Sequence, residues 1–180
     1  MEVEVRRLAR DDAAALARLR RESLEREPLA FGSSVDADPH GSEAAFRDSL
    51  GRGDEVAVFG AFAVAGELVG MVGIARSPRG KRRHKAGVFG MYVAKPWRRR
   101  GLGRLLMEQA IASARGWPDV EEVALSVTTA APGARQLYES LGFRPWGTEP
   151  RAILHEGRYE DEVHLVLALA DTDGVSPRGW

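Results

Sequence analysis

The chain has 180 residues, 29% of them charged, with 26 acidic and 26 basic side chains, a formal net charge of zero and no cysteine. This length and composition predict one ordinary globular domain, and the zero net charge argues against a dedicated nucleic-acid binder because electrostatics would supply little overall attraction. The absence of cysteine excludes disulfides, thiolate metal sites and cysteine nucleophiles.

The N-terminal segment is charged and lacks the apolar core of a signal peptide, and the longest apolar run, near Ala57–Ala65, is too short to span a membrane. We therefore expect a cytoplasmic protein without membrane contact. In the first half of the chain, the sequence predicts one strand, then two helices, and then a pair of strands. In chain order these are a strand at Val3–Leu8, helices at Ala13–Arg26 and Ser42–Leu50, and strands at Glu55–Ala63 and Leu68–Arg76.

The second half alternates strands with helices. The apolar run Val88–Val93 ends before Pro96, and a helical pattern of apolar residues begins at Leu102. A disordered tail is predicted at residues 171–180 from its turn-forming composition, which leaves one domain over residues 1–170. The remaining predicted elements are a strand at Val120–Thr128, a helix at Ala134–Leu141, and a hairpin of Arg151–Leu154 with Glu160–Ala168.

A basic, glycine-containing loop, Arg98–Gly103, joins the predicted central strand to the helix that starts at Leu102. The N–H groups of a helix's first turn and the helix dipole favour an anion, and glycines let the backbone approach it closely. A dinucleotide fingerprint would need a third glycine at Leu106, and a P-loop would need serine or threonine at Arg82 after Gly80-Lys81. The loop therefore predicts a pyrophosphate-binding site that matches neither the dinucleotide fingerprint nor the P-loop.

A second motif, Ala134-x-x-Leu137-Tyr138-x-x-Leu141-Gly142-Phe143, follows about 30 residues later. Together with Arg-x-x-Gly-x-Gly after a strand, it resembles the GNAT superfamily of N-acetyltransferases over most of the chain, from Val3 to Leu169. The resemblance implies a mixed α/β fold whose central sheet is mostly antiparallel and flanked by helices. It also implies that a parallel pair of strands splays apart to form the cofactor cleft.

The resemblance further implies acetyl-CoA as the acetyl donor, with no metal. The first-turn N–H groups from Arg100 to Gly103 would hold the pyrophosphate, and the backbone of Met91 and Val93 would pair with the pantetheine amides. The residues expected to bind the cofactor are Met91, Tyr92, Val93, Arg98, Arg99, Arg100, Gly101, Leu102, Gly103, Arg104, Ala131 and Arg135.

Tyr138 is the candidate catalytic residue, because a tyrosine in this position of the family protonates the leaving thiolate. A thiol titrates near pH ~8.5 and a phenol near ~10, so a neutral phenol can donate this proton at little cost. The alternative is that Tyr138 is a core aromatic on the apolar face it shares with Ala134 and Leu141. Both interpretations stay open at the level of sequence.

The sequence does not identify the proton acceptor for the attacking amine. Candidates are His84, His164, Glu27 and Glu162, and a chain of water molecules would serve equally well. Many family members carry an asparagine where this chain has Ala131, so close relatives are a poor guide to the acceptor.

The predicted function is transfer of an acetyl group to a primary amine by direct attack in a ternary complex. The amine, on a small molecule or at a protein N-terminus or lysine, would be shaped by residues 27–34, including Phe31, and by the last hairpin. A non-catalytic acyl-CoA sensor and an enzyme for longer acyl groups are the alternatives. A homodimer and the role of the basic loop 81–85 remain open.

Overall fold

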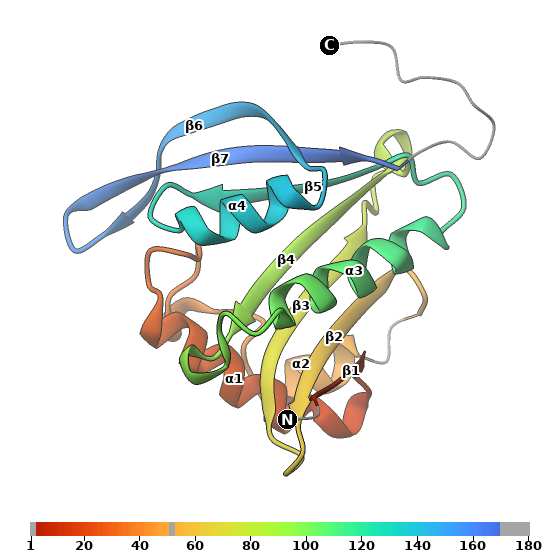
Figure 1. Cartoon of the computed structure of the whole chain (residues 1–180), viewed down its shortest axis with the longest axis vertical. Helices are drawn as coiled ribbons and strands as arrows, with labels where there is room; N and C mark the ends of the chain where they lie inside the picture. Colours follow the sequence, from red (N-terminus) through yellow and green to blue (C-terminus); the bar gives the residue numbers. More distant parts are fainter. Residues whose placement is uncertain (1–2, 51–52, 170–180) are drawn as a thin grey trace.

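The computed structural model describes residues 3–50 and 53–169, which form one seven-stranded sheet in the order β1-β2-β3-β4-β5-β7-β6 (Figure 1). Every neighbouring pair is antiparallel except β4 and β5, which run parallel. This confirms the predicted mixed α/β, mostly antiparallel fold. The strands are β1 (Val3–Arg7), β2 (Val56–Ala63), β3 (Leu68–Arg76), β4 (Lys85–Val93), β5 (Glu122–Thr128), β6 (Arg144–His155) and β7 (Arg158–Ala168).

The helices cover the two faces of the sheet, so that β2 and β3 are buried on both sides and consist almost entirely of apolar residues. One core lies under α3 and α4 and contains Leu106, Val123 and Tyr138, while the other lies under α1 and contains Leu16, with Phe46 of α2 packed against it. The helices are α1 (Ala13–Arg26), α2 (Glu43–Ser49), α3 (Leu102–Arg115) and α4 (Pro132–Ser140).

The parallel strands β4 and β5 are paired only at one end. Residues Lys85–Gly87 pair with Glu122–Ala124, and beyond them the two strands diverge (Figure 1). The register of β4 against β3 also shifts, since Gly73 pairs with Phe89 but Met71 pairs with Tyr92. The extra residue on β4 is a bulge at Gly90, whose φ of +62° favours glycine. The splayed pair implied by the family resemblance is therefore present.

The predicted order of elements is confirmed, although β7 begins two residues before the predicted Glu160, and two other strands differ more from the sequence pattern. β4 begins at Lys85 instead of Val88, and β6 begins at Arg144 instead of Arg151. In β6, Pro145 and Gly147 interrupt the strand pattern, but an edge strand tolerates both because one of its edges needs no partner. The tail predicted at residues 171–180 lies outside the described residues. None of the helices within the described ranges is long and apolar enough to cross a bilayer.

Candidate active site

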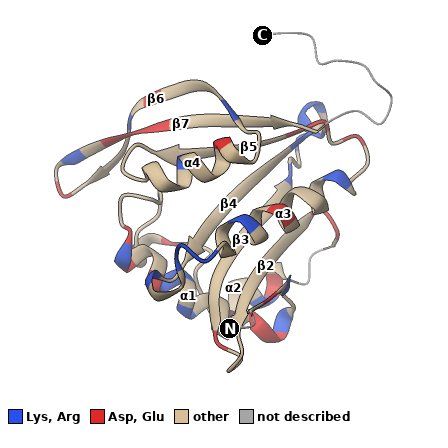
Figure 2. Cartoon of the chain, in the orientation of Figure 1, with Lys and Arg blue, Asp and Glu red and all other residues tan. Residues whose placement is uncertain are grey.

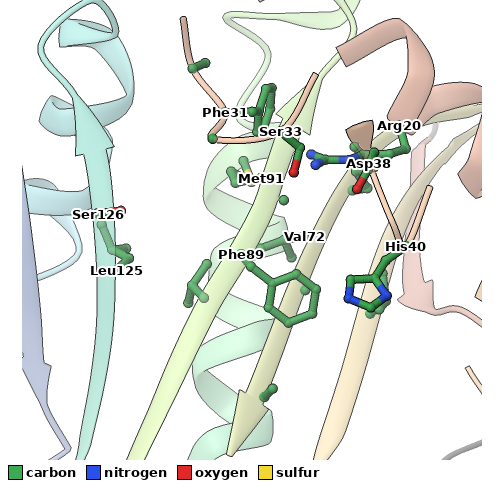
Figure 3. A pocket seen from close by; sticks show the side chains of 18 of the residues that line it. Arg20, Phe31, Ser33, Asp38, His40, Val72, Phe89, Met91, Leu125 and Ser126 are labelled. Carbon is green, nitrogen blue, oxygen red and sulfur yellow. Dashed lines mark hydrogen bonds and ion pairs between the residues drawn. The ribbon is translucent and has the colours of Figure 1, made fainter. Parts of the chain in front are cut away.

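The gap between β4 and β5 opens into a cavity of about 690 Å³ that reaches both faces of the sheet (Figure 3). On one side it is lined by β5 and α4, including Leu125 and Tyr138. On the other side it is lined by α1, α2 and the loop between them, including Arg20 and Phe31. Two reactants entering from opposite faces of the sheet could therefore meet inside this cavity.

The predicted phosphate loop leads directly into α3 and carries the only run of three arginines in the sequence (Figure 2). Gly101, at φ +81° and ψ −4°, precedes the helix, and its carbonyl accepts the first helical hydrogen bond from Leu105 at 3.1 Å. The backbone N–H groups before Leu105 therefore point out of the helix end. A side chain built on Gly101 would meet no atom within 4 Å, so the space beside this helix end is open.

The arginines of the loop differ in their contacts. Arg98 is used inside the protein, because its Nε donates to the Val93 carbonyl at 2.8 Å and its guanidinium forms a 2.7 Å ion pair with Glu27. Its guanidinium also lies 5.5 Å from the ring of Tyr92. Arg99 has a φ of +63°, which marks it as a turn residue. Arg98 thus fixes the loop against β4.

Three further arginines expected at the cofactor site, one in the loop and two on the helices, also have partners. Arg100 lies 5.1 Å from the ring of Trp97, and Arg104 donates to Ser140 at 2.7 Å, which joins α3 to α4. Arg135 forms an ion pair with Glu139 at 2.8 Å within α4. All of these side chains are exposed enough to reorient toward an anion.

The edge of β4 that faces away from β3 presents the backbone groups of Met91 and Val93, of which the Val93 carbonyl already accepts the bond from Arg98. The Ala94 N–H donates to the Val69 carbonyl of β3 at 2.9 Å, and backbone groups of successive residues in a strand point to opposite edges. The backbone N–H and C=O of Tyr92 therefore point toward β3, whereas those of Met91 and Val93 point toward the gap. The Tyr92 side chain lies in the core under α1, where burial and its bond to Glu22 raise its pKa to about 12.

Gly103 allows α3, α4 and β4 to approach one another closely. A Cβ at this position would lie 3.0 Å from Leu137 Cδ2 and 3.2 Å from Met91 Cε. Leu102 is buried in the core beneath the first turn of α3. The second glycine of the motif therefore serves packing, and the first, Gly101, leaves the helix end open.

Tyr138 has both of the properties that the sequence suggested. Its side chain is buried, packs edge-on against Phe143 with ring centroids 6.2 Å apart, and also lines the cavity. Burial raises its pKa to about 12. Its hydroxyl makes no hydrogen bond with another described residue, and the described residues contain no fully buried unsatisfied polar atom. The hydroxyl is therefore the part of the side chain that remains open to the cavity.

Of the four candidate proton acceptors, Glu162 is the one that lines the cavity. Glu27 is paired with Arg98, and His164 lies 3.3 Å from Glu149 with its ring against Trp146. His84 precedes β4 at the end far from the phosphate loop. Glu162 forms no ion pair or hydrogen bond with any described residue.

Several cavity residues carry no signal in the sequence. Arg20, Asp38 and His40 come from a charged helix and a polar loop, and Phe89 is one more apolar residue in a strand, whereas Ser33 belongs to residues 27–34, which were expected from the sequence on the acceptor side. Their positions depend on how the loop folds against α1, which no local motif records. Ala131 lines the cavity too. No cluster of three or more metal-ligating side chains occurs in the described part of the chain.

The chain matches the model of the acetyltransferase (GNAT) family over residues 16–143. A GNAT-family acetyltransferase from Streptococcus pneumoniae is 27% identical, with 93% of this chain and 100% of that chain covered and a TM-score of 0.82. The fold also matches yncA from Salmonella typhimurium with its cofactor acetyl-CoA, at 20% identity, full coverage of both chains and a TM-score of 0.80. A phosphinothricin acetyltransferase from Sinorhizobium meliloti in complex with acetyl-CoA is 19% identical, with 99% and 94% covered and a TM-score of 0.79. Because the family match covers more than half of its residues, the chain belongs to the GNAT acetyltransferase family.

Proposed function

We propose that this protein is an acetyl-CoA-dependent N-acetyltransferase that acts on a primary amine by direct attack in a ternary complex. The observation that carries the proposal is one continuous cavity, which is lined by β4, by Tyr138 of α4 and, on the other face of the sheet, by α1 and α2. Such a cavity brings donor and acceptor together without a covalent enzyme intermediate. The two similar structures that contain acetyl-CoA support the identity of the donor.

The donor would bind along the edge that β5 leaves unpaired. Its pyrophosphate would accept hydrogen bonds from the N–H groups at the start of α3, where Gly101 leaves room. Its pantetheine amides would pair with the backbone of Met91 and Val93, as an added strand would. Arg99, Arg100, Arg104 and Arg135 would supply positive charge around the phosphates, while Arg98 holds the loop in place.

Acetyl transfer would need a base for the amine, a hydrogen-bond donor for the oxyanion and an acid for the departing sulfur. Glu162 would take a proton from the ammonium group, directly or through water, so that the neutral nitrogen attacks the thioester carbonyl. A backbone N–H near Met91 would stabilise the oxyanion. The C–N bond then forms, the C–S bond breaks, and Tyr138 donates its proton to the departing sulfur. The proton that the amide nitrogen loses restores the phenol.

Substitution of Gly101 tests the donor site. Gly101→Asp would place a carboxylate where the pyrophosphate binds, and we expect calorimetry to show at least a 100-fold weaker affinity for acetyl-CoA. Gly101→Asn is the matched control, because asparagine tolerates a positive φ and has the same shape without the charge. Asparagine should retain more of the affinity than aspartate.

Circular dichroism of both variants should show an unchanged fold, since a side chain at this position meets open space. Release of free thiol from acetyl-CoA in the presence of primary amines then tests turnover. Undiminished acetyl-CoA affinity in Gly101→Asp would overturn this assignment of the loop.

A further inference from the structure

The guanidinium of Arg20 is largely buried, but only some of its N–H groups donate hydrogen bonds. Its side chain is 15% exposed, and its Nε donates to Asp38 Oδ2 at 2.8 Å, while the Asp38 side chain is 8% exposed. Its two terminal NH₂ groups form no hydrogen bond with any described residue. A guanidinium has five N–H groups, so Asp38 leaves most of its donors available.

These unused donors point into the cavity. Figure 3 shows the guanidinium extending from α1 toward the hydroxyl of Ser33, and both residues line the cavity. Ser33 likewise makes no hydrogen bond with another described residue. The ring of Phe31 lies 5.0 Å from the guanidinium and restricts its orientation. Two sets of polar donors therefore converge on one part of the cavity wall.

The neighbouring walls are apolar. Phe89 of β4 lines the cavity near this polar group (Figure 3), whereas Val72 and Met91 pack toward the core on the α3 side of the sheet. Phe89 is 49% exposed although it belongs to a central strand, and its ring covers Gly73, where a Cβ would come within 2.2 Å. An exposed aromatic ring inside a cavity is a surface for the carbon skeleton of a ligand.

We infer that Arg20 and Ser33 form a subsite for an acid group on the acceptor, which rests on the proposed N-acetyltransferase function. The two NH₂ groups of a guanidinium match the two oxygens of a carboxylate, and Ser33 adds a third donor. The acceptor class is thus a small primary amine that carries a carboxylate and an apolar side chain, as an apolar amino acid does.

The other charges of the cavity fit such an acceptor. Asp38 engages only the Nε of Arg20 and leaves its terminal NH₂ groups available, while Glu162 on β7 has no ion-pair partner among the described residues. Glu162 would attract the ammonium group, and the guanidinium of Arg20 would attract the carboxylate.

Matched acceptors with and without the acid group test this inference. The pairs are L-phenylalanine with 2-phenylethylamine and L-methionine with 3-(methylthio)propylamine, and the quantity measured is kcat/KM from thiol release. The wild type should prefer the amino acid of each pair. Arg20→Gln should lower kcat/KM for the amino acid by roughly 10- to 100-fold and change that of the simple amine by less than about threefold.

Two further variants separate recognition from stability. Arg21→Gln alters the next residue of α1, which is paired with Glu25 and does not line the cavity, and it should keep the wild-type preference. Asp38→Asn keeps the guanidinium but removes its competing charge, and it should maintain or increase the preference. A role confined to stability would instead make Arg20→Gln lower kcat/KM equally for both members of a pair.

The results also distinguish this inference from the function on which it rests. Efficient acetylation of the simple amines with no preference for the amino acids would overturn the acid subsite alone. Preferential acetylation of a tetrapeptide N-terminus, whose carboxylate lies far from its amine, would do the same. Binding of acetyl-CoA without acetylation of any amine would overturn both.

Discussion

Tyr138 is both a core aromatic and a cavity residue, so the two interpretations of its sequence position do not exclude each other. Phe143 holds the ring, and the hydroxyl faces the cavity. Because burial raises its pKa to about 12, the phenol stays protonated at every pH at which the fold would normally be studied. The phenol is thus available as a proton donor, but donation to a thiolate costs more than it would from an ordinary phenol, because the Tyr138 pKa lies further above the thiol value near ~8.5.

Tyr138→Phe removes the proton donor and preserves the ring. We expect kcat to fall by roughly 10²- to 10⁴-fold, as for the loss of a general acid, with an unchanged dissociation constant for acetyl-CoA. Tyr159→Phe is the control, because this half-exposed tyrosine of β7 lies outside the cavity and undergoes the same chemical change. Equal kcat values for the wild type and Tyr138→Phe would assign Tyr138 to the core alone.

The sequence predicts a site residue well when that residue belongs to a motif of neighbouring positions, and poorly when folding alone brings it to the site. The phosphate loop and Tyr138 belong to motifs that are contiguous in sequence, so their pattern indicates their surroundings. Arg20 and Ser33 meet only after the loop between α1 and α2 folds back on α1. Glu162 was one of four equivalent candidates until the pairing of β5 with β7 placed it at the cavity.

Among the elements, β4 shows how far strand patterning carries. Its apolar run predicted a strand, and Gly90 within that run is a recognised signal of a bulge. The unpaired edge at Met91 and Val93 cannot be predicted from this run, because it depends on the pairing of β4 with β3 on one side and on the divergence of β5 on the other. β6 was underestimated because Pro145 and Gly147 resemble turn residues, and pairing with β7 overrides that local preference.

The junction between β1 and α1 is stabilised by one ion pair with good geometry. Both terminal nitrogens of Arg6 lie 2.8 Å from the carboxylate of Asp12, which also accepts the Ala9 N–H at 2.8 Å. The hydrogen bond from Arg6 lowers the pKa of Asp12 below its ordinary value. A lowered carboxyl pKa contributes stability above the unfolded-state pKa, near ~3.9, and that stability is lost as the pH falls below it.

Asp12→Asn should therefore destabilise the fold by about 1–2 kcal/mol at pH 7, measured by urea unfolding. The difference from the wild type should shrink as the pH falls from 5 to 3, because in this range Asp12 of the unfolded wild-type chain takes up a proton, which favours unfolding. Asp54→Asn is the control, since Asp54 is 98% exposed and lies 3.9 Å from Arg7, and it should have almost no effect. A difference independent of pH would contradict the role of the charge.

At the level of the whole molecule, one sheet carries two cores, and the site lies where the sheet is incomplete. On the sides away from the gap, β4 is paired with β3 and β5 with β7, so the unpaired edge of β4 is a feature of the folded sheet. A ligand that completes this edge binds only the folded chain. Its binding free energy therefore adds directly to stability.

Acetyl-CoA at 100 times its dissociation constant should stabilise the protein by about 2.7 kcal/mol. For a chain of this size, that corresponds to a rise in Tm of roughly 5–10 °C, measured by differential scanning calorimetry. Gly101→Asp should show almost no rise at the same concentration. An equal rise in that variant would place the ligand elsewhere on the molecule.

The short pairing between β4 and β5 also determines how the gap can change its width. Three residue pairs at one end join the strands, with the ion pair between Lys85 and Glu122 at the first of them. From Gly87 to Val93, β4 extends roughly 20 Å beyond this junction. A rotation of about 5° at the junction would therefore alter the separation near Val93 by roughly 2 Å, which makes the paired end the pivot of a lever. In such a motion the width of the gap would depend on Lys85–Gly87 and Glu122–Ala124, which pair at the closed end.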